Sequence, residues 1–513
     1  MTASLEKSTL ARNTVWSALG YGVQFVTPVV MIPYTLSKVS DASYGGWVAL
    51  YTLATWVSYY DLGLWGSLTR DVAERQARQD RDGLRGIWAT WFAFDVLVGI
   101  GLILAAVLLG PEILRRAEVR LDPGLALQLF VGLTAQFVLT PMHRHLTYTI
   151  HGLQRLDLTN GIAILATPLW AAAQVAFLEL GWGLKGLMIN GLLFMVLQIL
   201  VLIVLIRRLG YPISFRPRHV SSAELRRMIG FGWKLQAGTL VNQAFRSDRL
   251  VLNKMQANAA MVTVYQLGAG IMITLAGAVS VLSSGILSAV SDLAARGDRE
   301  RVKLVFLRGT KYHALAGVGL LGFAALFGRE LMVFWMGRTL DESVVVLRIM
   351  ALGGIATCIG SCGQSVGIAL GRPGWAAVSS VAGLAATVFL YMTVGRGYDY
   401  VGLAASVSMG LALIQVVFMI GLRGFLEFRW REYVGNALLK PAVLAVPLAG
   451  VYAGWSALAP HLPPVETRLR AFLVLAPAFL VTAALGWAMA RIFRVVDDYD
   501  LGVLKSPGQR PPA

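Results

Sequence analysis

The sequence predicts an all-α polytopic membrane protein with about 14 transmembrane helices. Apolar stretches of about 20 residues recur along the chain, and each is long enough to cross a hydrocarbon layer of about 30 Å as a helix. Charged residues make up 14% of the 513 residues and hydrophobic ones 56%, whereas an average soluble protein has about 25% charged residues. This composition excludes a soluble enzyme, a nucleic-acid-binding domain and a disordered chain.

Fourteen apolar stretches are the predicted spans, and an even number places both termini on one side. Lys and Arg gather in segments 70–85, 207–227, 296–303 and 423–431, which the spans place on one face. Because positive loops stay in the cytoplasm, we expect cytoplasmic N and C termini. The spans begin near Thr14, Tyr44, Ile87, Gly124, Leu158, Leu184, Phe231, Met261, Val305, Val344, Gly374, Val401, Asn436 and Arg470.

The longest connection divides the chain into four predicted parts. Residues 1–206 form an N-terminal six-helix bundle, 207–230 a cytoplasmic amphipathic linker, 231–425 a C-terminal six-helix bundle, and 426–513 two extra transmembrane helices and a cytoplasmic tail. The linker contains Ser221 and Glu224 in a capping-box pattern, which opens a short helix. Its arginines suit a helix on an anionic leaflet; an ordinary positive loop is the alternative.

The seventh predicted span carries a polar stripe. A charge at mid-bilayer costs about 2.5–3.5 kcal/mol, so a stripe with two guanidinium groups is expected to line a wet cavity or a bundle interior. Guanidinium pairs bidentately with phosphate or carboxylate, which makes these groups candidate anion ligands; structural pairing with acids is the alternative. The stripe is Thr239, Asn242, Arg246, Arg249 and Asn253, at helical steps of three and four.

Three further cations extend this hypothesis. Arg308 and Lys311 lie near the cytoplasmic start of the ninth span, and Arg348 near the external start of the tenth. If they face one cavity with Arg246, they form a ladder of positive charge across the membrane. Side chains that reach for the interface are the alternative for Arg308 and Arg348.

Acids and histidines form a second group of candidates. Asp61, Asp95 and Asp248 lie inside spans, where a carboxylate can bind H⁺ or Na⁺ for coupling or can be a structural partner; for Asp248 we expect a partner on an adjacent helix. His143, His145 and His151 fall in a predicted cytoplasmic loop, solvated or, alternatively, metal-binding.

Catalytic motifs are absent from the sequence. It has no P-loop, no G-x-S-x-G and no H-E-x-x-H. We therefore expect no enzyme activity and no cofactor other than a coupling ion.

Several short segments of the chain share their pattern with a known family. They are 13–20, 44–47, 61–64, 70–73, 231–233, 247–250 and Tyr265, and the first-half pattern at 61–64 and 70–73 is the most specific. Through these segments the chain resembles the Wzx-type polysaccharide flippases of the MOP (MATE-like) exporter superfamily, over most of residues 10–425.

The resemblance implies two six-helix bundles in a MATE-like V around a cationic central cavity, with alternating access. It implies a multi-pass protein of the bacterial cytoplasmic (inner) membrane that moves undecaprenyl-diphosphate-linked oligosaccharide to the outer leaflet, for exopolysaccharide, O-antigen or capsule. A polysaccharide polymerase and a chain-length regulator are implied partners, with membrane lipids around a monomer and no nucleic acid. A MATE-like ion-coupled drug or metabolite antiporter is the alternative. The related lipid II flippases carry arginines in the first span, and none lies between Thr14 and Pro33.

Overall fold

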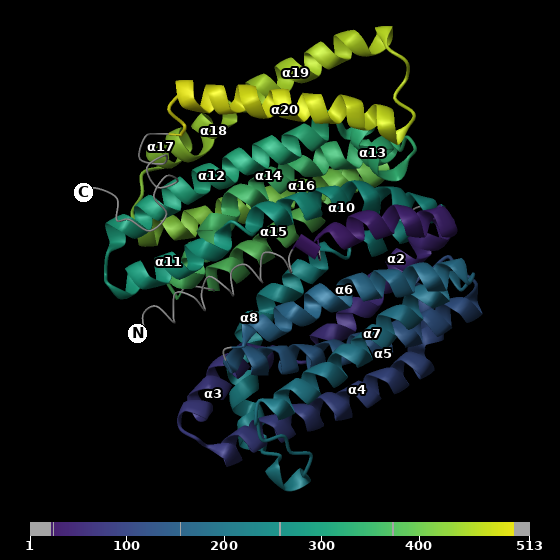
Figure 1. Cartoon of the computed structure of the whole chain (residues 1–513), viewed down its shortest axis with the longest axis vertical. Coiled ribbons are helices and arrows are strands. Elements are labelled where there is room, and N and C mark those ends of the chain that lie inside the picture. The colour runs from purple at the N-terminus through teal and green to yellow at the C-terminus, as the bar shows by residue number, and fades with distance from the viewer. Residues whose placement is uncertain (1–21, 24, 154, 256–257, 372–373, 497–513) are drawn as a thin grey trace. The chain divides into compact units, whose positions relative to one another are not determined.

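The computed structural model describes residues 22–496 except 24, 154, 256–257 and 372–373 (Figure 1). Across these residues all regular elements are helical, which confirms the all-α prediction. Ten helices in the described part are long and apolar enough to span a membrane, and a bent pair, α12 with α13, makes an eleventh. The three remaining predicted spans correspond to the helix at 25–38, to α2 and to α8, and the start of the first span lies outside the described residues.

By its packing the chain divides into two compact units, Met1–Thr263 and Val264–Ala513. In the first unit α5 is central and contacts α2, α3, α4 and α7. Two apolar clusters fill this unit, one around Trp88 and Trp91 and the other around Leu129 and Leu133. Its helices are α2 (Asp41–Thr55), η1 (Trp56–Tyr59), α3 (Trp65–Ala77), α4 (Arg81–Ala117), α5 (Pro123–Gly152), α6 (Leu156–Glu179), α7 (Gly183–Arg208), η2 (Pro217–His219), α8 (Ser222–Phe245) and α9 (Asp248–Met255).

In the second unit α14 is central and contacts α11, α12, α13 and α16. Glycines allow this close packing, because a Cβ on Gly360 would overlap the side chain of Gln415 on α16. The helices are α10 (Ala260–Ser280), α11 (Ser283–Ala295), α12 (Arg299–Leu326), α13 (Gly328–Met336), α14 (Asp341–Ala369), α15 (Gly374–Thr393), η3 (Gly395–Tyr398), α16 (Asp399–Leu426), α17 (Trp430–Glu432), η4 (Tyr433–Leu439), α18 (Lys440–Ala442), α19 (Ala445–Leu458), η5 (Ala459–His461) and α20 (Arg468–Ile492).

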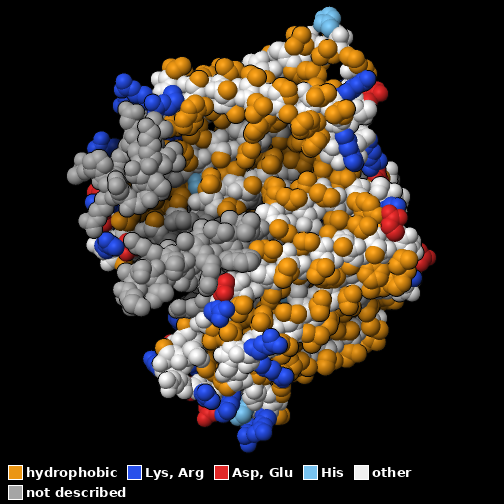
Figure 2. Space-filling view, viewed as in Figure 1, with side chains coloured by type: hydrophobic (Ala, Val, Ile, Leu, Met, Phe, Trp, Pro, Cys, Tyr) orange, Lys and Arg blue, Asp and Glu red, His pale blue; other side chains and the backbone are white. Residues whose placement is uncertain are grey.

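The exposed helix faces are apolar. On α4, Leu97 and Leu108 are each 75% exposed, with Ile100 and Leu104 between them on the same face. Figure 2 shows hydrophobic side chains over the broad middle of the helices, with charged side chains gathered near their ends. Exposed apolar area on this scale requires a lipid environment, so the chain is a multi-pass membrane protein.

The predicted linker helix and the seventh span form one helix, α8. Ser221 is its N-cap and its hydroxyl accepts the N–H of Glu224 at 3.3 Å, as the capping pattern indicates. Glu224 forms ion pairs with Arg75 of α3 and with Arg227. This end of α8 therefore packs against α3. The contacts of α8 and α9 place both helices in the first unit. The sequence analysis places them in the C-terminal bundle at 231–425. The division into two six-helix bundles stays a prediction.

Candidate functional site

A turn at residues 60–64 interrupts the helical path between η1 and α3 in the first unit. Leu62 and Gly63 have positive φ angles of 47° and 75°, which end the helix. The interruption frees backbone groups that lipid cannot satisfy. The amide of Gln236 on α8 donates to the carbonyl of Tyr59 at 3.1 Å, and the Gly63 N–H donates to the Asp61 carboxylate at 3.3 Å. The turn is therefore held by α8 and by Asp61.

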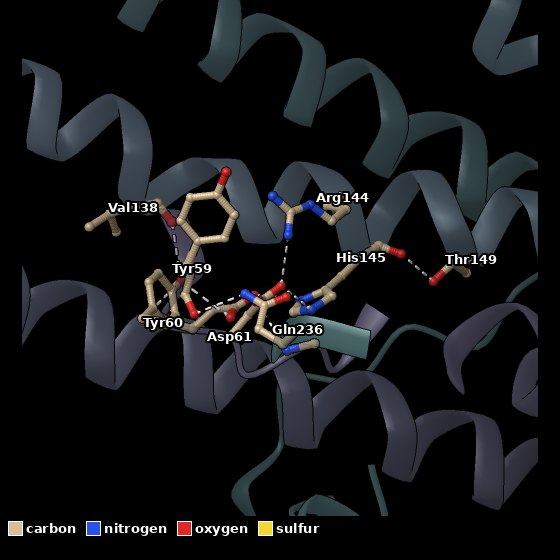
Figure 3. A network of polar contacts seen from close by, with 10 residues as sticks. Tyr59, Tyr60, Asp61, Val138, Arg144, His145, Thr149 and Gln236 are labelled. Carbon is tan, nitrogen blue, oxygen red and sulfur yellow. Dashed lines mark hydrogen bonds and ion pairs between the residues drawn. The ribbon is translucent and has the colours of Figure 1, made fainter. Parts of the chain in front are cut away.

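Asp61 is the centre of a buried polar network (Figure 3), and its side chain has no exposed surface. One carboxylate oxygen accepts from the Arg144 guanidinium at 3.3 Å. The other accepts from the Gln236 amide at 3.3 Å as well as from Gly63. Asp61 thus joins the turn to both α5 and α8.

Asp95 of α4 is the second carboxylate of this network and is 1% exposed. Its Oδ2 lies 2.8 Å from Nδ1 of His145 on α5, and its Oδ1 accepts from the Tyr60 hydroxyl at 3.2 Å. The Tyr60 hydroxyl also lies 3.1 Å from the Val138 carbonyl. Four segments of the first unit are therefore joined by one network: α4, the turn, α5 and α8.

The histidines do not lie in a solvated loop, so that prediction is wrong. All three are in α5, which continues as a helix to Gly152, and His145 is fully buried. His143 and His151 instead line a polar cavity of about 410 Å³ with Thr147, Trp170 and others. No group of three or more metal-binding side chains occurs among the described residues.

We expect Arg144→Leu to lower the free energy of unfolding by about 3 kcal/mol, because it leaves the Asp61 carboxylate buried without its guanidinium partner. Denaturant titration of the purified protein in detergent measures this change. The double variant Arg144→Leu/Asp61→Asn removes both charges and should regain most of the loss. Equal stability of the two variants would show that the ion pair is not the cause.

Arg246 lies in the break between α8 and α9, where its backbone caps α8. Its side chain is exposed, and its guanidinium group makes no hydrogen bond or ion pair with any described residue. Ser247, next in the chain, accepts the indole N–H of Trp56 at 3.0 Å. Trp56 is 37% and Tyr51 42% exposed, and Asn242 is exposed one helical turn before Arg246. We call these four exposed residues, Arg246, Trp56, Tyr51 and Asn242, the Arg246 surface.

The predicted stripe is not one continuous helix, because α8 ends at Phe245 and α9 begins at Asp248. Asp248 forms an ion pair at 2.5 Å with Arg249, its neighbour in the chain, and both side chains are buried. Asn253 is also buried and donates to the carbonyls of Ala117 and Glu118 at 3.0 and 3.1 Å. Arg249 and Asn253 therefore have structural partners, whereas the guanidinium of Arg246 has none in the part of the chain that the structure describes.

The three cations of the second unit are placed differently from one another. Lys311 is 7% exposed, and its Nζ lies 4.9 Å from the ring centre of Tyr312. Arg308 is half-buried one helical turn earlier on α12. Arg348 on α14 is exposed and donates from Nε to the Ala325 carbonyl at 3.0 Å. Their predicted role with Arg246 in one cavity remains a prediction.

Comparison with known proteins identifies solved structures of similar fold. No family model matches the chain, and no curated protein matches its sequence. A lipid II flippase, MurJ, in an inward closed conformation aligns with a TM-score of 0.68 at 12% identity, over 93% of this chain and 99% of that one. The chain has the MOP fold. An inward-facing multidrug resistance MATE transporter of the MOP superfamily aligns with a TM-score of 0.60 at 14% identity, over 81% and 94%.

A third MOP-fold structure is a transporter from Pyrococcus furiosus whose binding pocket is described as having reverse polarity. It aligns with a TM-score of 0.61 at 14% identity, over 82% of this chain and 96% of that one. All three are transporters or flippases. These three likenesses show the fold of the chain.

Proposed function

We propose that the protein is a flippase for undecaprenyl-diphosphate-linked oligosaccharides. It moves these repeat units from the inner to the outer leaflet of the bacterial cytoplasmic membrane by alternating access, for exopolysaccharide, O-antigen or capsule. The observation that carries the proposal is the exposed Arg246 guanidinium, which has no partner among the described residues. An exposed guanidinium with no partner among the described residues can bind an anion without breaking an existing ion pair.

The chemistry of the Arg246 surface suits a glycan attached to a diphosphate. The guanidinium can form two parallel hydrogen bonds to phosphate oxygens. Asn242 offers an amide donor and acceptor, and Trp56 and Tyr51 offer aromatic faces with polar tips. A drug that is itself a lipophilic cation would be repelled by Arg246. The surface therefore favours an anionic, hydroxyl-rich cargo.

The extent of the MOP fold is a second support. The lipid II flippase covers 93% of the chain, whereas the MATE transporter covers 81%. The larger share of the chain that aligns with the lipid II flippase favours a lipid-linked cargo over a small drug.

In the proposed cycle the diphosphate first meets Arg308 and Lys311, then binds Arg246 with Arg249 and Arg348 along the path, while the prenyl chain stays in lipid. The glycan occupies the wet cavity. Asp61, Asp95 and Asp248 are the acids available to couple H⁺ or Na⁺ to this movement. A polysaccharide polymerase and a chain-length regulator would receive the exported unit.

Reconstitution of the purified protein in proteoliposomes tests the proposal. One set contains an undecaprenyl-diphosphate-linked oligosaccharide whose glycan is labelled, and a second set is given a lipophilic cationic drug. We expect the labelled glycan to become accessible on the opposite leaflet and no drug to be transported. Drug transport without glycan movement would establish the alternative, an ion-coupled antiporter.

A further inference from the structure

His145 lies between two buried carboxylates of the first unit (Figure 3). Its Nδ1 is 2.8 Å from Asp95 Oδ2 and its Nε2 is 3.7 Å from Asp61 Oδ2. Nε2 is fully buried and has no hydrogen-bond partner among the described residues. A neutral imidazole carries one N–H, whereas a protonated one carries two. The geometry thus has a carboxylate facing each nitrogen, as a protonated ring requires.

The charges of the network balance when it binds one additional proton. Asp61 and Asp95 bring two negative charges, and Arg144 brings one positive charge. Tyr60 and Gln236 add hydroxyl and amide donors without charge. An uncompensated charge in a buried site costs free energy. A proton on His145 makes the network neutral, and its loss leaves one negative charge unbalanced.

The same contacts favour a proton over a metal cation. On Asp61 the oxygens already accept from Arg144, Gln236 and the Gly63 N–H. On Asp95 they accept from His145 and Tyr60. A sodium ion would have to displace several of these donors and approach a guanidinium group. A proton needs no such space.

The network reaches the molecular surface at Arg144. The Arg144 side chain is 23% exposed, and its guanidinium stacks over the ring of Trp65 at 5.9 Å. The same guanidinium donates to the buried Asp61 carboxylate. A proton can therefore exchange past Arg144, while the His145 ring itself stays enclosed.

The network is connected to the Arg246 surface through α8. Gln236 of α8 donates to Asp61 and to the Tyr59 carbonyl. Arg246 caps the same helix ten residues later, about 15 Å along its axis. A change in the hydrogen bond between Gln236 and Asp61 therefore moves α8, and Arg246 moves with it.

We propose that His145 is the proton-binding group of this transporter. When His145 is protonated, the network holds α8, and with it Arg246, in the position that the structure shows. The link to cargo rests on the proposed function, whereas the proton site rests on the network alone. Because coupling between two binding sites is reciprocal, cargo at Arg246 changes the affinity of His145 for its proton. Release of that proton on one side of the membrane then drives the change between the inward-open and outward-open states.

Tryptophan fluorescence tests the proton site without any cargo. The Trp91 ring lies 5.2 Å from the His145 ring, and a protonated imidazole quenches a neighbouring indole. We expect a pH-dependent change in the fluorescence of the purified protein that is lost in both His145→Gln and Trp91→Phe. His143→Gln is the matched control on α5 and should keep the change. An unchanged titration in His145→Gln would overturn the proposal.

A second variant protects this test if His145→Gln does not fold. Asp95→Asn keeps the His145 imidazole but removes a neighbouring negative charge. The pH-dependent fluorescence change should persist in this variant but differ from the native one, because the ring loses the carboxylate that faces Nδ1. A titration identical to that of the native protein would also contradict the assignment.

Transport in proteoliposomes tests the coupling. For the native protein we expect an imposed pH gradient to speed glycan movement at least about tenfold, with proton flow reported by a pH dye in the lumen. His145→Gln should bind the lipid-linked oligosaccharide with an affinity that no longer depends on pH, and it should lose this stimulation. Retained stimulation in His145→Gln, or stimulation by a sodium gradient alone, would overturn the proposal. If no gradient moves the glycan, the proposed function fails, and the fluorescence titration still decides the proton site.

Discussion

Replacement of Arg246 by alanine is expected to lower transport of lipid-linked oligosaccharide roughly a hundredfold while leaving the protein folded. Loss of a charged hydrogen-bonding partner to a desolvated phosphate costs about 3 kcal/mol, which corresponds to that factor. The free energy of unfolding should not change, because the guanidinium is exposed and has no partner among the described residues. Glycan movement in proteoliposomes and denaturant titration in detergent measure the two quantities.

Two control variants make this result specific. Arg246→Lys keeps the charge but loses the two-pronged geometry, so we expect an intermediate rate. Arg116→Ala removes another exposed arginine, one whose ion pair is with Glu112, and should transport at the native rate. Native transport by Arg246→Ala would refute the role assigned to Arg246.

Replacement of Gly232 by alanine is expected to lower the free energy of unfolding by about 2–3 kcal/mol, as overpacking of a close backbone contact does. A Cβ at this position would overlap the backbone of Gly63, whose own left-handed conformation fixes the turn. The turn would have to move away from α8, and the Gln236 contacts with Asp61 and Tyr59 would lengthen. Transport should fall with stability, because α8 loses its anchor.

Gly230 and Gly238 are matched controls on the same helix. A Cβ on either would meet nothing within 4 Å, and alanine is a better helix former than glycine by about 1 kcal/mol. Gly230→Ala and Gly238→Ala should therefore be neutral or stabilising. The effect of a Gly→Ala substitution on the free energy of unfolding thus changes sign within one helix. Thermal or denaturant unfolding in detergent measures it. Equal effects at all three positions would contradict the close contact with Gly63.

The sequence predicts the helices well where one physical signal dominates. Apolar length locates the membrane spans, because lipid imposes the same requirement on each of them. The Ser221 cap was predictable, since a hydroxyl before a helix with glutamate three residues later is a local signal. The sequence also predicts Arg246 as a candidate ligand, and the structure adds that its side chain is exposed and has no partner among the described residues.

The break after Phe245 could not be predicted, because the polar spacing from Thr239 to Asn253 continues through it without interruption. The break is set by tertiary contacts, as Asn253 reaches the carbonyls at the end of α4. The helical position of His145 is a second feature that the composition conceals. Its segment is polar and follows an apolar stretch, which predicts a loop, although Leu146 and Ile150 keep the four-residue spacing of a buried helix face.

The union of the linker helix and the seventh span in α8 has a consequence for how homologous sequences can differ in length. One residue inserted between Ser222 and Gln236 would rotate everything beyond it by about 100°, turning Gln236 away from Asp61 and Arg246 away from its neighbours. The irregular segment at 211–216, ahead of η2, can absorb such an insertion without this effect. Length variation should thus be tolerated ahead of Ser221 and forbidden after it, which makes this residue the start of a fixed register.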